Sequence, residues 1–539
     1  MAGVDMSAAV TSVQEPPSHP APRASGSSAV PGLPLILTAA VMTALADFLF
    51  YGAPTGWTLG AFAACVLLAS AVLNPHLLAG QWGKAAFVLT LGLCAALFEY
   101  PSALAVCMTV TGLASLVTSS VVRFRGSAGR WARGLGMFAV EWAPRILVDA
   151  VRISAAATSV FTQRMVAPAL ASWIVPLGLS ALFFALFYVA NPVIASWVDA
   201  LNWVTYPDVW LPPFGRMAFW IFTTLALWPF LRARLFRRDT QPETAAPVPV
   251  LNAKESDWLR STLLPQGAMI KSLVLFNALF ALQNGLDIEY LWRGAMLPEG
   301  MTFASYAHQS VYPLLLTALL AAAFVLIAFP PDLQEKPSRL IGGLLVLWVA
   351  QNVFLVASSM QRTALYIDEY SLTYLRVSAL IWMGLIAAGL IWIVLRIALG
   401  RSSRWLINAN VLTLGAVLYV CCFIDFGAII ANYNVRNCRE INGTSAILDL
   451  DYLRYDIGVS SLPALRWLAS EATRATPGSA LADRGPGFAA SADRLEADLH
   501  QKGQNWRAWT YRGYRLGQKL RSLAEPPLEP VSGWPVVRP

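Results

Sequence analysis

The sequence predicts an all-α, polytopic transmembrane helical bundle of about eleven spans, with a small helical region outside the membrane at its C-terminal end. Hydrophobic residues make up 57% of the 539 residues and charged residues only 13%, whereas an ordinary soluble protein has about 25% charged residues. The apolar residues also occur in continuous runs of about 20, the length that an α-helix needs to cross a bilayer. Continuous runs indicate helices, because the strands of a membrane barrel alternate apolar and polar residues.

The predicted spans follow one another along most of the chain. The second and third runs are short, and the polar stretch "NPHLLAGQWG" between them leaves their ends open. The runs are approximately 33–51, 57–73, 83–99, 102–122, 172–192, 214–231, 268–285, 309–330, 340–360, 374–397 and 408–430.

The distribution of Lys and Arg between the runs predicts the orientation of the spans, because basic connections stay in the cytoplasm. Basic residues are frequent in one set of connections and rare in those that alternate with it. The basic set is 123–171, 232–267, 331–339 and 398–407, and the alternating set is 193–213, 286–308 and 361–373. We therefore expect a multi-pass protein of the cell inner (plasma) membrane with a cytoplasmic N-terminus and an extracytoplasmic C-terminus.

The regions outside the spans differ in composition. Residues 1–32 are rich in Pro, Ser, Ala and Gly and predict a disordered cytoplasmic tail, residues 33–430 the bundle, and residues 431–539 an extracytoplasmic helical region. Segment 130–145 has an apolar stripe flanked by Arg. Such a helix lies either on an anionic leaflet or packed under the bundle.

The C-terminal region contains two helix candidates on either side of the polar stretch "TPGSALADRGPG". The first is "TSAILDLDYLRYDIG", and the second runs from about Ser491 to Leu523 with an interruption at Gly503. The stretch "GVSSLPAL" at Gly458 lacks the closing Gly of a nucleophile elbow and predicts a turn at a helix start.

No established catalytic, metal-binding or cofactor motif occurs in the sequence. The four His are scattered, the six Cys form no CxxC pair, and no HExxH or P-loop pattern is present. We therefore predict no cofactor and no metal. The net charge of +8 does not predict nucleic-acid binding, and the lipid bilayer, with anionic lipid at 130–145, is the partner that the sequence indicates.

Polar residues inside the apolar runs and in the adjoining outer-face connections are the candidates for a functional site, because charges at membrane depth are costly and usually face the bundle interior. On the predicted topology they share one layer, made of the outer halves of the spans and the outer-face connections. That layer is either a ligand-holding pocket or a set of interhelical hydrogen bonds. The candidates are Asp47, Gln283, Asn284, Asp287, Glu289, Tyr290, Gln351, Asn352, Arg362, Asp368, Arg376 and Asp425.

The layer leads to two specific expectations. A buried carboxylate needs a partner, so Asp425 or Asp368 should lie within ion-pair distance of Arg376 or Arg362. The stretch "LDIEYLWRGAMLPEG" at 286–300 should form the rim of the pocket, with Tyr290 and Trp292 packed over the layer.

Three separated blocks resemble a bacterial family of integral membrane proteins. They begin at "NALFALQNGLDIEYLWRGAM", "QRTALYIDEYSLTYLRVSAL" and "ANYNV", and they lie between about residues 250 and 470. They look like the core of the DUF 4173 family, which is related to DUF 4153. The resemblance implies a polytopic inner-membrane protein and implies no activity.

Two classes of function fit these observations. The first, which we favour, is a non-enzymatic protein that binds a solute or lipid, is transporter-like, or acts as an envelope scaffold. The second is a membrane-embedded enzyme that acts on a lipid or envelope substrate and uses Asp368 or Asp425 for acid/base chemistry. Converging carboxylates in an outer cleft would favour the enzyme.

Overall fold

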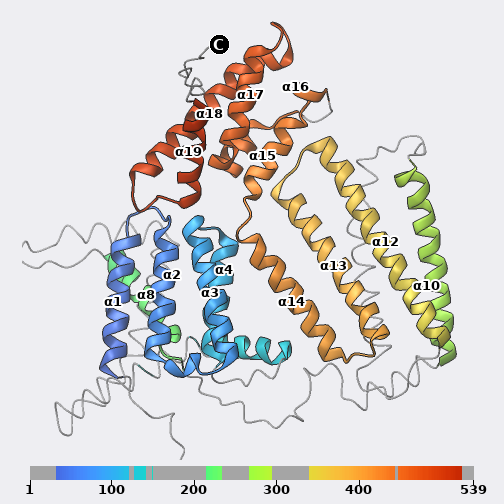
Figure 1. Ribbon diagram of the computed structural model, residues 1–539, viewed down its shortest axis with the longest axis horizontal. Helices are drawn as coiled ribbons and strands as arrows, with labels where there is room; N and C mark the ends of the chain where they lie inside the picture. The colour runs from blue at the N-terminus through green and yellow to red at the C-terminus, as the bar shows by residue number, and fades with distance from the viewer. Residues whose placement is uncertain are drawn as a thin grey trace, which may run out of the picture.

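The computed structural model describes residues 32–119, 127–140, 142, 149, 214–233, 266–293, 339–443 and 447–524. These residues form 14 α-helices and no strand, which confirms the all-α prediction. Figure 1 shows three parts: two helical bundles side by side, and a further group of helices above them. We call these parts the first bundle, the second bundle and the cap.

The first bundle consists of α1 (Leu33–Phe50), α2 (Thr58–Leu73), α3 (Gln81–Glu99), α4 (Ala103–Ser119) and α8 (Phe214–Leu231). Its core is made mainly of Leu and Ala side chains, of which Leu67, Leu97 and Leu116 are fully or almost fully buried. Asn74, which follows α2, donates a hydrogen bond of 2.8 Å to the Leu231 carbonyl at the end of α8. This bond ties a connection to a helix that is distant in sequence.

The second bundle consists of α10 (Gln266–Leu286), the π-helical turn η3 (Asp287–Trp292), α12 (Arg339–Tyr370), α13 (Tyr374–Ala398) and α14 (Ser403–Cys421). Its core contains Leu273, Leu345, Trp348 and Met383. Helix α14 also contacts α4, so it joins the second bundle to the first.

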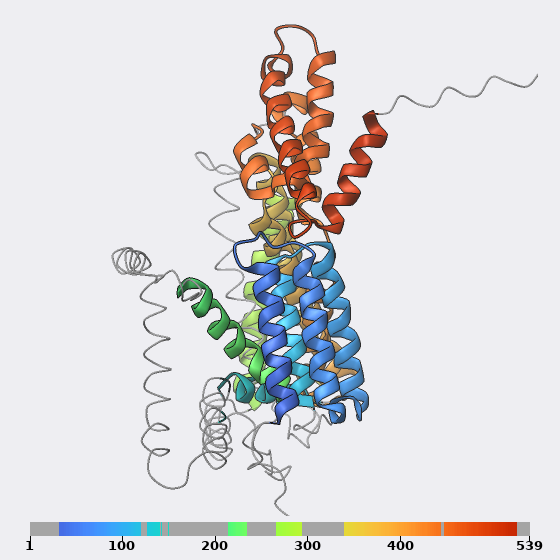
Figure 2. The ribbon, with the colours of Figure 1, turned by 90° about the vertical axis from the view of Figure 1, so that its left-hand side faces the viewer.

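The cap begins at Phe426 and stands on one end of the two bundles (Figure 2). Its core is formed mainly by α15, α17 and α18 around side chains such as Leu465, Leu468 and Phe488, which are fully buried. The elements of the cap are α15 (Phe426–Arg436), α16 (Arg439–Asn442), η4 (Tyr452–Ile457), η5 (Gly458–Ser461), α17 (Leu462–Arg474), α18 (Ala480–Gln504) and α19 (Tyr511–Ala524).

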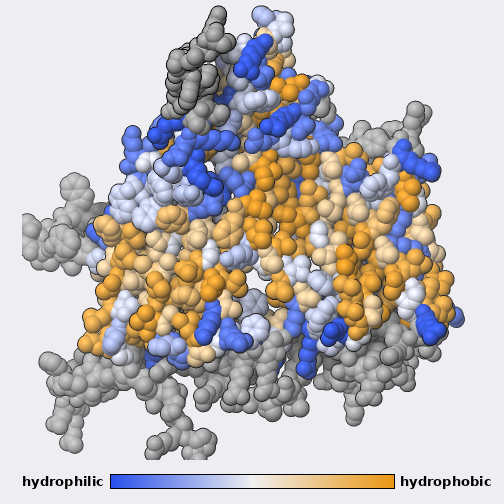
Figure 3. Space-filling view, in the orientation of Figure 1, coloured by the Kyte–Doolittle hydropathy of each residue, from blue (hydrophilic) through white to orange (hydrophobic). Residues whose placement is uncertain are grey.

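Five of the described helices are long and apolar enough to cross a membrane: 33–50, 81–99, 339–370, 374–398 and 404–421. Helices α2 and α4 are apolar but shorter. The predicted spans 172–192 and 309–330 lie outside the described residues. The structure therefore supports a helical membrane protein, and the number of eleven spans stays a prediction. Figure 3 agrees with this assignment, because apolar residues cover the bundles and polar residues cover the cap.

Three sequence-based boundaries need correction. The predicted span 408–430 is two helices, because α14 ends at Cys421 and Asp425 caps the start of α15. The predicted helix from Ser491 begins instead at Ala480, with Ser479 as its N-cap and Pro486 inside it. The candidate at "TSAILDLDYLRYDIG" forms the short π-helical turn η4. The turn predicted at Gly458 is confirmed, because η5 leads directly into α17.

Residues 128–140, which overlap the predicted amphipathic segment 130–145, form a helix. Phe138 is buried in the first-bundle core, and the indole of Trp131 donates to Ser115 Oγ at 3.0 Å. The apolar stripe thus packs under the bundle, which is the second of the two alternatives. Binding of anionic lipid by its Arg side chains stays a prediction.

Candidate functional site

The cap is held on the first bundle by the turn that precedes α19. The backbone N–H of Trp57 donates to the Trp509 carbonyl at 2.8 Å, and the indole of Trp57 donates to the Trp506 carbonyl at 2.7 Å. A Cβ atom added at Gly56 would lie only 2.4 Å from the Trp509 carbonyl oxygen. The close approach therefore requires glycine at position 56.

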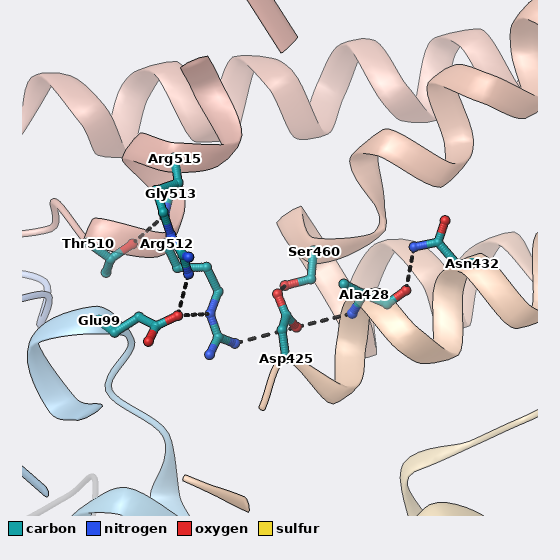
Figure 4. Close-up of polar contacts among 9 residues, drawn as sticks. All are labelled: Glu99, Asp425, Ala428, Asn432, Ser460, Thr510, Arg512, Gly513 and Arg515. Carbon is teal, nitrogen blue, oxygen red and sulfur yellow. Dashed lines mark hydrogen bonds and ion pairs between the residues drawn. The ribbon is translucent and has the colours of Figure 1, made fainter. Parts of the chain in front are cut away.

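Arg512 of α19 connects the first bundle to the cap (Figure 4). Its Nε lies 3.6 Å from Glu99 Oε1 at the end of α3, and its Nη1 lies 3.4 Å from Asp425 Oδ1 at the start of the cap. The guanidinium also stands 4.8 Å from the ring centre of Tyr100. Arg515 adds a second ion pair to Glu99 at 2.5 Å. Two cations thus neutralise Glu99.

Asp425 directs each of its carboxylate oxygens to a different neighbour. Oδ1 accepts the backbone N–H of Ala428 at 3.0 Å, which caps α15, and Oδ2 accepts the hydroxyl of Ser460 at 3.1 Å. Figure 4 shows both contacts beside Arg512. Through these two bonds and the Arg512 ion pair, Asp425 is a structural link between the last span and the cap.

A cleft of about 810 Å³ opens where the cap meets the first bundle. We call it the junction cleft. Its walls are Tyr100 and Pro101 of the first bundle, the segment 454–460 of η4 and η5, the C-terminal half of α18, and one face of α19. The cleft lies beside the Arg512 contacts, since Arg512 and Ser460 both line it. Drug-sized ligands occupy pockets of about 300–1,000 Å³, so the junction cleft has room for a small ligand.

Many of the charged groups in the junction cleft neutralise one another. Lys502 pairs with Asp498 at 2.7 Å, and Glu496 pairs with Arg466, with His500 Nε2 3.9 Å away. The Glu496 carboxylate raises the pKa of Arg466 above its usual value. These pairs hold the C-terminal half of α18 in a fixed arrangement along one wall.

A second polar cluster lies between α10 and α12, inside the second bundle. The guanidinium of Arg362 forms an ion pair with Asp287, and both side chains have 0% exposure. Gln283 donates to the same Asp287 oxygen at 2.9 Å. Asp287 is the first residue of the π-helical turn η3. Such π-helical turns occur frequently at functional sites.

Neighbouring amides extend this cluster along the α10–α12 contact. Asn284 Nδ2 donates to the Gln351 carbonyl at 3.2 Å, and Asn352 Nδ2 donates to the Trp348 carbonyl at 2.8 Å. The indole of Trp292 donates to Ser358 Oγ at 3.2 Å and stacks on Phe354. Trp292 therefore contacts α12 and stays half-exposed.

The remaining candidates on the second bundle lie closer to the cap. Asp368 accepts the hydroxyl of Tyr433 at 2.8 Å, which links α12 to α15. Burial, and then this hydrogen bond, raise the pKa of Tyr433 to about 12. Arg376 donates to the carbonyls of Tyr370, at 2.6 Å, and Ser371.

The expectation that Asp425 or Asp368 pairs with Arg376 or Arg362 is wrong for Arg376. Its guanidinium satisfies the backbone of the α12–α13 turn, where Ser371 has a positive φ of 68°. Asp425 pairs instead with Arg512, from the distant C-terminal segment, and Arg362 with Asp287.

Asp47 and the residues of η3 complete the set of candidates. Asp47 pairs with Arg216 at 2.5 Å between α1 and α8, in the first bundle and away from α10 (Figure 1). Glu289 forms an exposed pair with Arg293 at 3.1 Å, and Tyr290 lies in the same turn. The structure therefore brings together Gln283, Asn284, Asp287, Arg362 and the backbone of Gln351. Asn352 bonds within α12, and Asp47 lies apart from the cluster.

The comparisons with known proteins place this fold in a family. A family model described as a domain of unknown function (DUF4153) matches residues 35–468. The chain belongs to the DUF4153 family. The match starts well before residue 250, where the resemblance to the related DUF 4173 family begins in the sequence. Searches of curated proteins and of solved structures found no match.

The DUF4153 match covers all of the α10–α12 cluster but only part of the junction cleft. It includes the whole α10–α12 cluster, one wall of the junction cleft with Tyr100 and Arg454, and the Arg512 partners Glu99 and Asp425. It ends at residue 468, before α18 and α19. The other wall of the cleft therefore comes from residues beyond the DUF4153 match.

Sequence reasoning missed Glu99 and Arg512 as site residues. Glu99 is the last residue of an apolar run, and Arg512 belongs to the aromatic and basic stretch "NWRAWTYRGYR". That stretch is unusual enough to be noticed, but nothing in it indicates the partner more than 400 residues away. Among the described residues no group of three or more His, Cys, Asp or Glu could hold a metal ion.

Proposed function

We propose that this DUF4153 protein is a non-enzymatic, multi-pass membrane protein that binds a solute or a lipid headgroup in the junction cleft. The observation that carries the proposal is the cleft itself: about 810 Å³ between a polar cap and the end of an apolar bundle. Ligand sites occur preferentially at such interfaces between domains. A transporter-like or scaffold role is compatible with this site.

We further propose that the cap faces the outside of the inner membrane. The connection 399–402 lies at the end of the bundles opposite the cap, and the connections at 51–57, 371–373 and 422–425 lie at the cap end (Figure 1). The basic segments 331–339 and 398–407 adjoin the helix ends away from the cap. Because basic connections stay inside, this arrangement supports a cytoplasmic N-terminus.

The enzyme alternative has less support in the described geometry. An acid/base catalyst needs a carboxylate that can exchange a proton with a substrate. Asp425 is engaged by Ala428, Ser460 and Arg512, and Asp368 accepts the Tyr433 hydroxyl. Both carboxylates therefore have structural partners.

Filling the cleft tests the proposed function. Gly517 lines the cleft, and a Cβ atom added there would meet nothing within 4 Å. Gly517→Leu should therefore occupy ligand space without a clash. Gln518→Leu is the matched control, because residue 518 is the exposed neighbour and does not line the cleft.

The measurement is mass spectrometry of the small molecules and lipids that co-purify with each protein in a neutral detergent. We expect the wild type and Gln518→Leu to retain a molecule that Gly517→Leu loses. An identical set of bound molecules in all three proteins would contradict the proposal.

A further inference from the structure

The face of α19 that lines the junction cleft has a distinct pattern. It carries Arg512, Gly513, Leu516, Gly517, Leu520 and Arg521, residues that share one side of a helix because they recur at intervals of three to four. The two glycines and two leucines form an apolar floor, and one Arg stands at each end. At a rise of about 1.5 Å per residue, the Cα atoms of the two arginines lie about 13 Å apart along the helix axis.

The cleft carries excess positive charge on this wall. Residues 505–524 contain five basic residues and no acidic one. Arg512 is already engaged by Glu99 and Asp425, and Lys502 by Asp498. Among the described residues neither Arg521 nor Arg454 forms an ion pair, and Arg454 instead lies 4.8 Å from the centre of the Tyr455 ring. Asp456, in the same π-helical turn as Arg454, also lines the cleft.

We propose that the junction cleft binds an anionic amphiphile, in which a phosphate or carboxylate group is attached to an apolar chain. Arg521 and Arg454 bind the anionic group, because guanidinium groups form charge-assisted hydrogen bonds with both kinds of oxyanion. The apolar chain lies on Leu516, Leu520 and the open surface at Gly517. This inference rests on the proposed function and adds the chemical class of the ligand.

The test uses the full-length protein in a neutral detergent and three probes. The probes are a short-chain phosphatidylglycerol, a short-chain phosphatidylcholine of the same chain length, and glycerol 3-phosphate, each measured by calorimetry. We expect phosphatidylglycerol to bind about tenfold or more tightly than either other probe, because only it combines net negative charge with an apolar chain. Its affinity should fall as salt rises.

Two variants identify the groups responsible. Arg521→Gln should weaken the binding of phosphatidylglycerol about tenfold, the usual effect of losing one hydrogen bond to a charged group. Gly517→Leu should abolish binding. Arg494→Gln is the control, since Arg494 is an exposed residue of α18 outside the cleft, and it should leave the affinity unchanged.

Each alternative outcome has a separate meaning. Equal affinity for phosphatidylglycerol and phosphatidylcholine, with Gly517→Leu still blocking both, would overturn the anionic class and leave the proposed function standing. Equal affinity for glycerol 3-phosphate and phosphatidylglycerol would overturn the apolar part and identify a free phosphate ester as the ligand. Binding that Gly517→Leu does not affect would overturn both proposals.

Discussion

Arg512 links the first bundle to the cap, because Glu99 and Asp425 lie on either side of its guanidinium. Its side chain is only 14% exposed, so its ion pairs are weakly screened by solvent. We expect Arg512→Ala to lower the free energy of unfolding by about 1–3 kcal/mol, between the values for exposed and for buried pairs. Thermal unfolding in detergent and protease cleavage between the last span and the cap measure the effect.

Arg515→Ala is the matched control for this prediction. Arg515 also pairs with Glu99, at 2.5 Å, but its side chain is 56% exposed. Its removal should cost less than about 1 kcal/mol. A cap that is equally protected from protease in the wild type and in Arg512→Ala would contradict the linking role of Arg512.

Tyr433 predicts a specific pH dependence of stability. Burial and the hydrogen bond to Asp368 raise its pKa from 10.0 to about 12. The phenol loses its proton at a lower pH in the unfolded chain than in the folded protein. Its contribution to the free energy of unfolding is therefore complete below about pH 10 and is lost as the pH rises to about 12. Tyr433→Phe should be less stable than the wild type by about 1 kcal/mol near neutral pH.

The measurement is the difference in unfolding free energy between the two proteins from pH 8 to pH 12. Other tyrosines titrate in both proteins and cancel from the difference. The stability advantage of the wild type should shrink above pH 10. A constant difference across this range would mean that Tyr433 is not held protonated by the fold.

The contact between α10 and α12 depends on the buried ion pair of Asp287 and Arg362. Arg362→Met leaves a carboxylate at a site with 0% exposure, which typically costs about 3–5 kcal/mol. The double variant Asp287→Leu with Arg362→Met removes both charges and should recover at least about 1 kcal/mol relative to the sum of the single variants. Reversible unfolding in mixed detergent measures all four proteins, and strictly additive losses would refute the pairing.

The helices of the bundles could be predicted from the sequence, because a run of about 20 apolar residues has few alternatives in a membrane. The break at Asp425 could not, since apolar residues continue on both sides of it and a cap residue is recognised only from its contacts. The early start of α18 was missed for a related reason. The stretch "ADRGPG" is typical of a loop, yet packing of the core around Phe488 keeps this stretch helical.

The candidate site was predicted only in part. Polar residues at the ends of apolar runs and in the adjoining connections indicated the cluster around Asp287 and Arg362, because buried charges in a membrane require partners. The junction cleft was not predicted, because it is formed by residues 100–101, 454–460 and 495–521, and the first of these segments is separated from the others by hundreds of positions. No local sequence pattern indicates a contact between segments so far apart along the chain.

The orientation of the molecule as a whole gives another testable expectation. Basic connections at the end opposite the cap predict that Pro539 is outside the membrane and the N-terminus inside. A reporter enzyme that is active only outside the cytoplasm should be active when fused after Pro539. A fluorescent reporter that folds only in the cytoplasm should be dark there, and a bright signal would reverse the orientation.

The central claim is that the cap is docked on the bundle through Arg512 and leaves a ligand cleft beside it. The most direct measurement is an electron cryo-microscopy map of the full chain in nanodiscs that contain phosphatidylglycerol. We predict Arg512 between Glu99 and Asp425, together with elongated non-protein density along Leu516, Gly517 and Leu520. A map in which the cap is detached from the bundle, or in which protein side chains fill the cleft, would contradict the account.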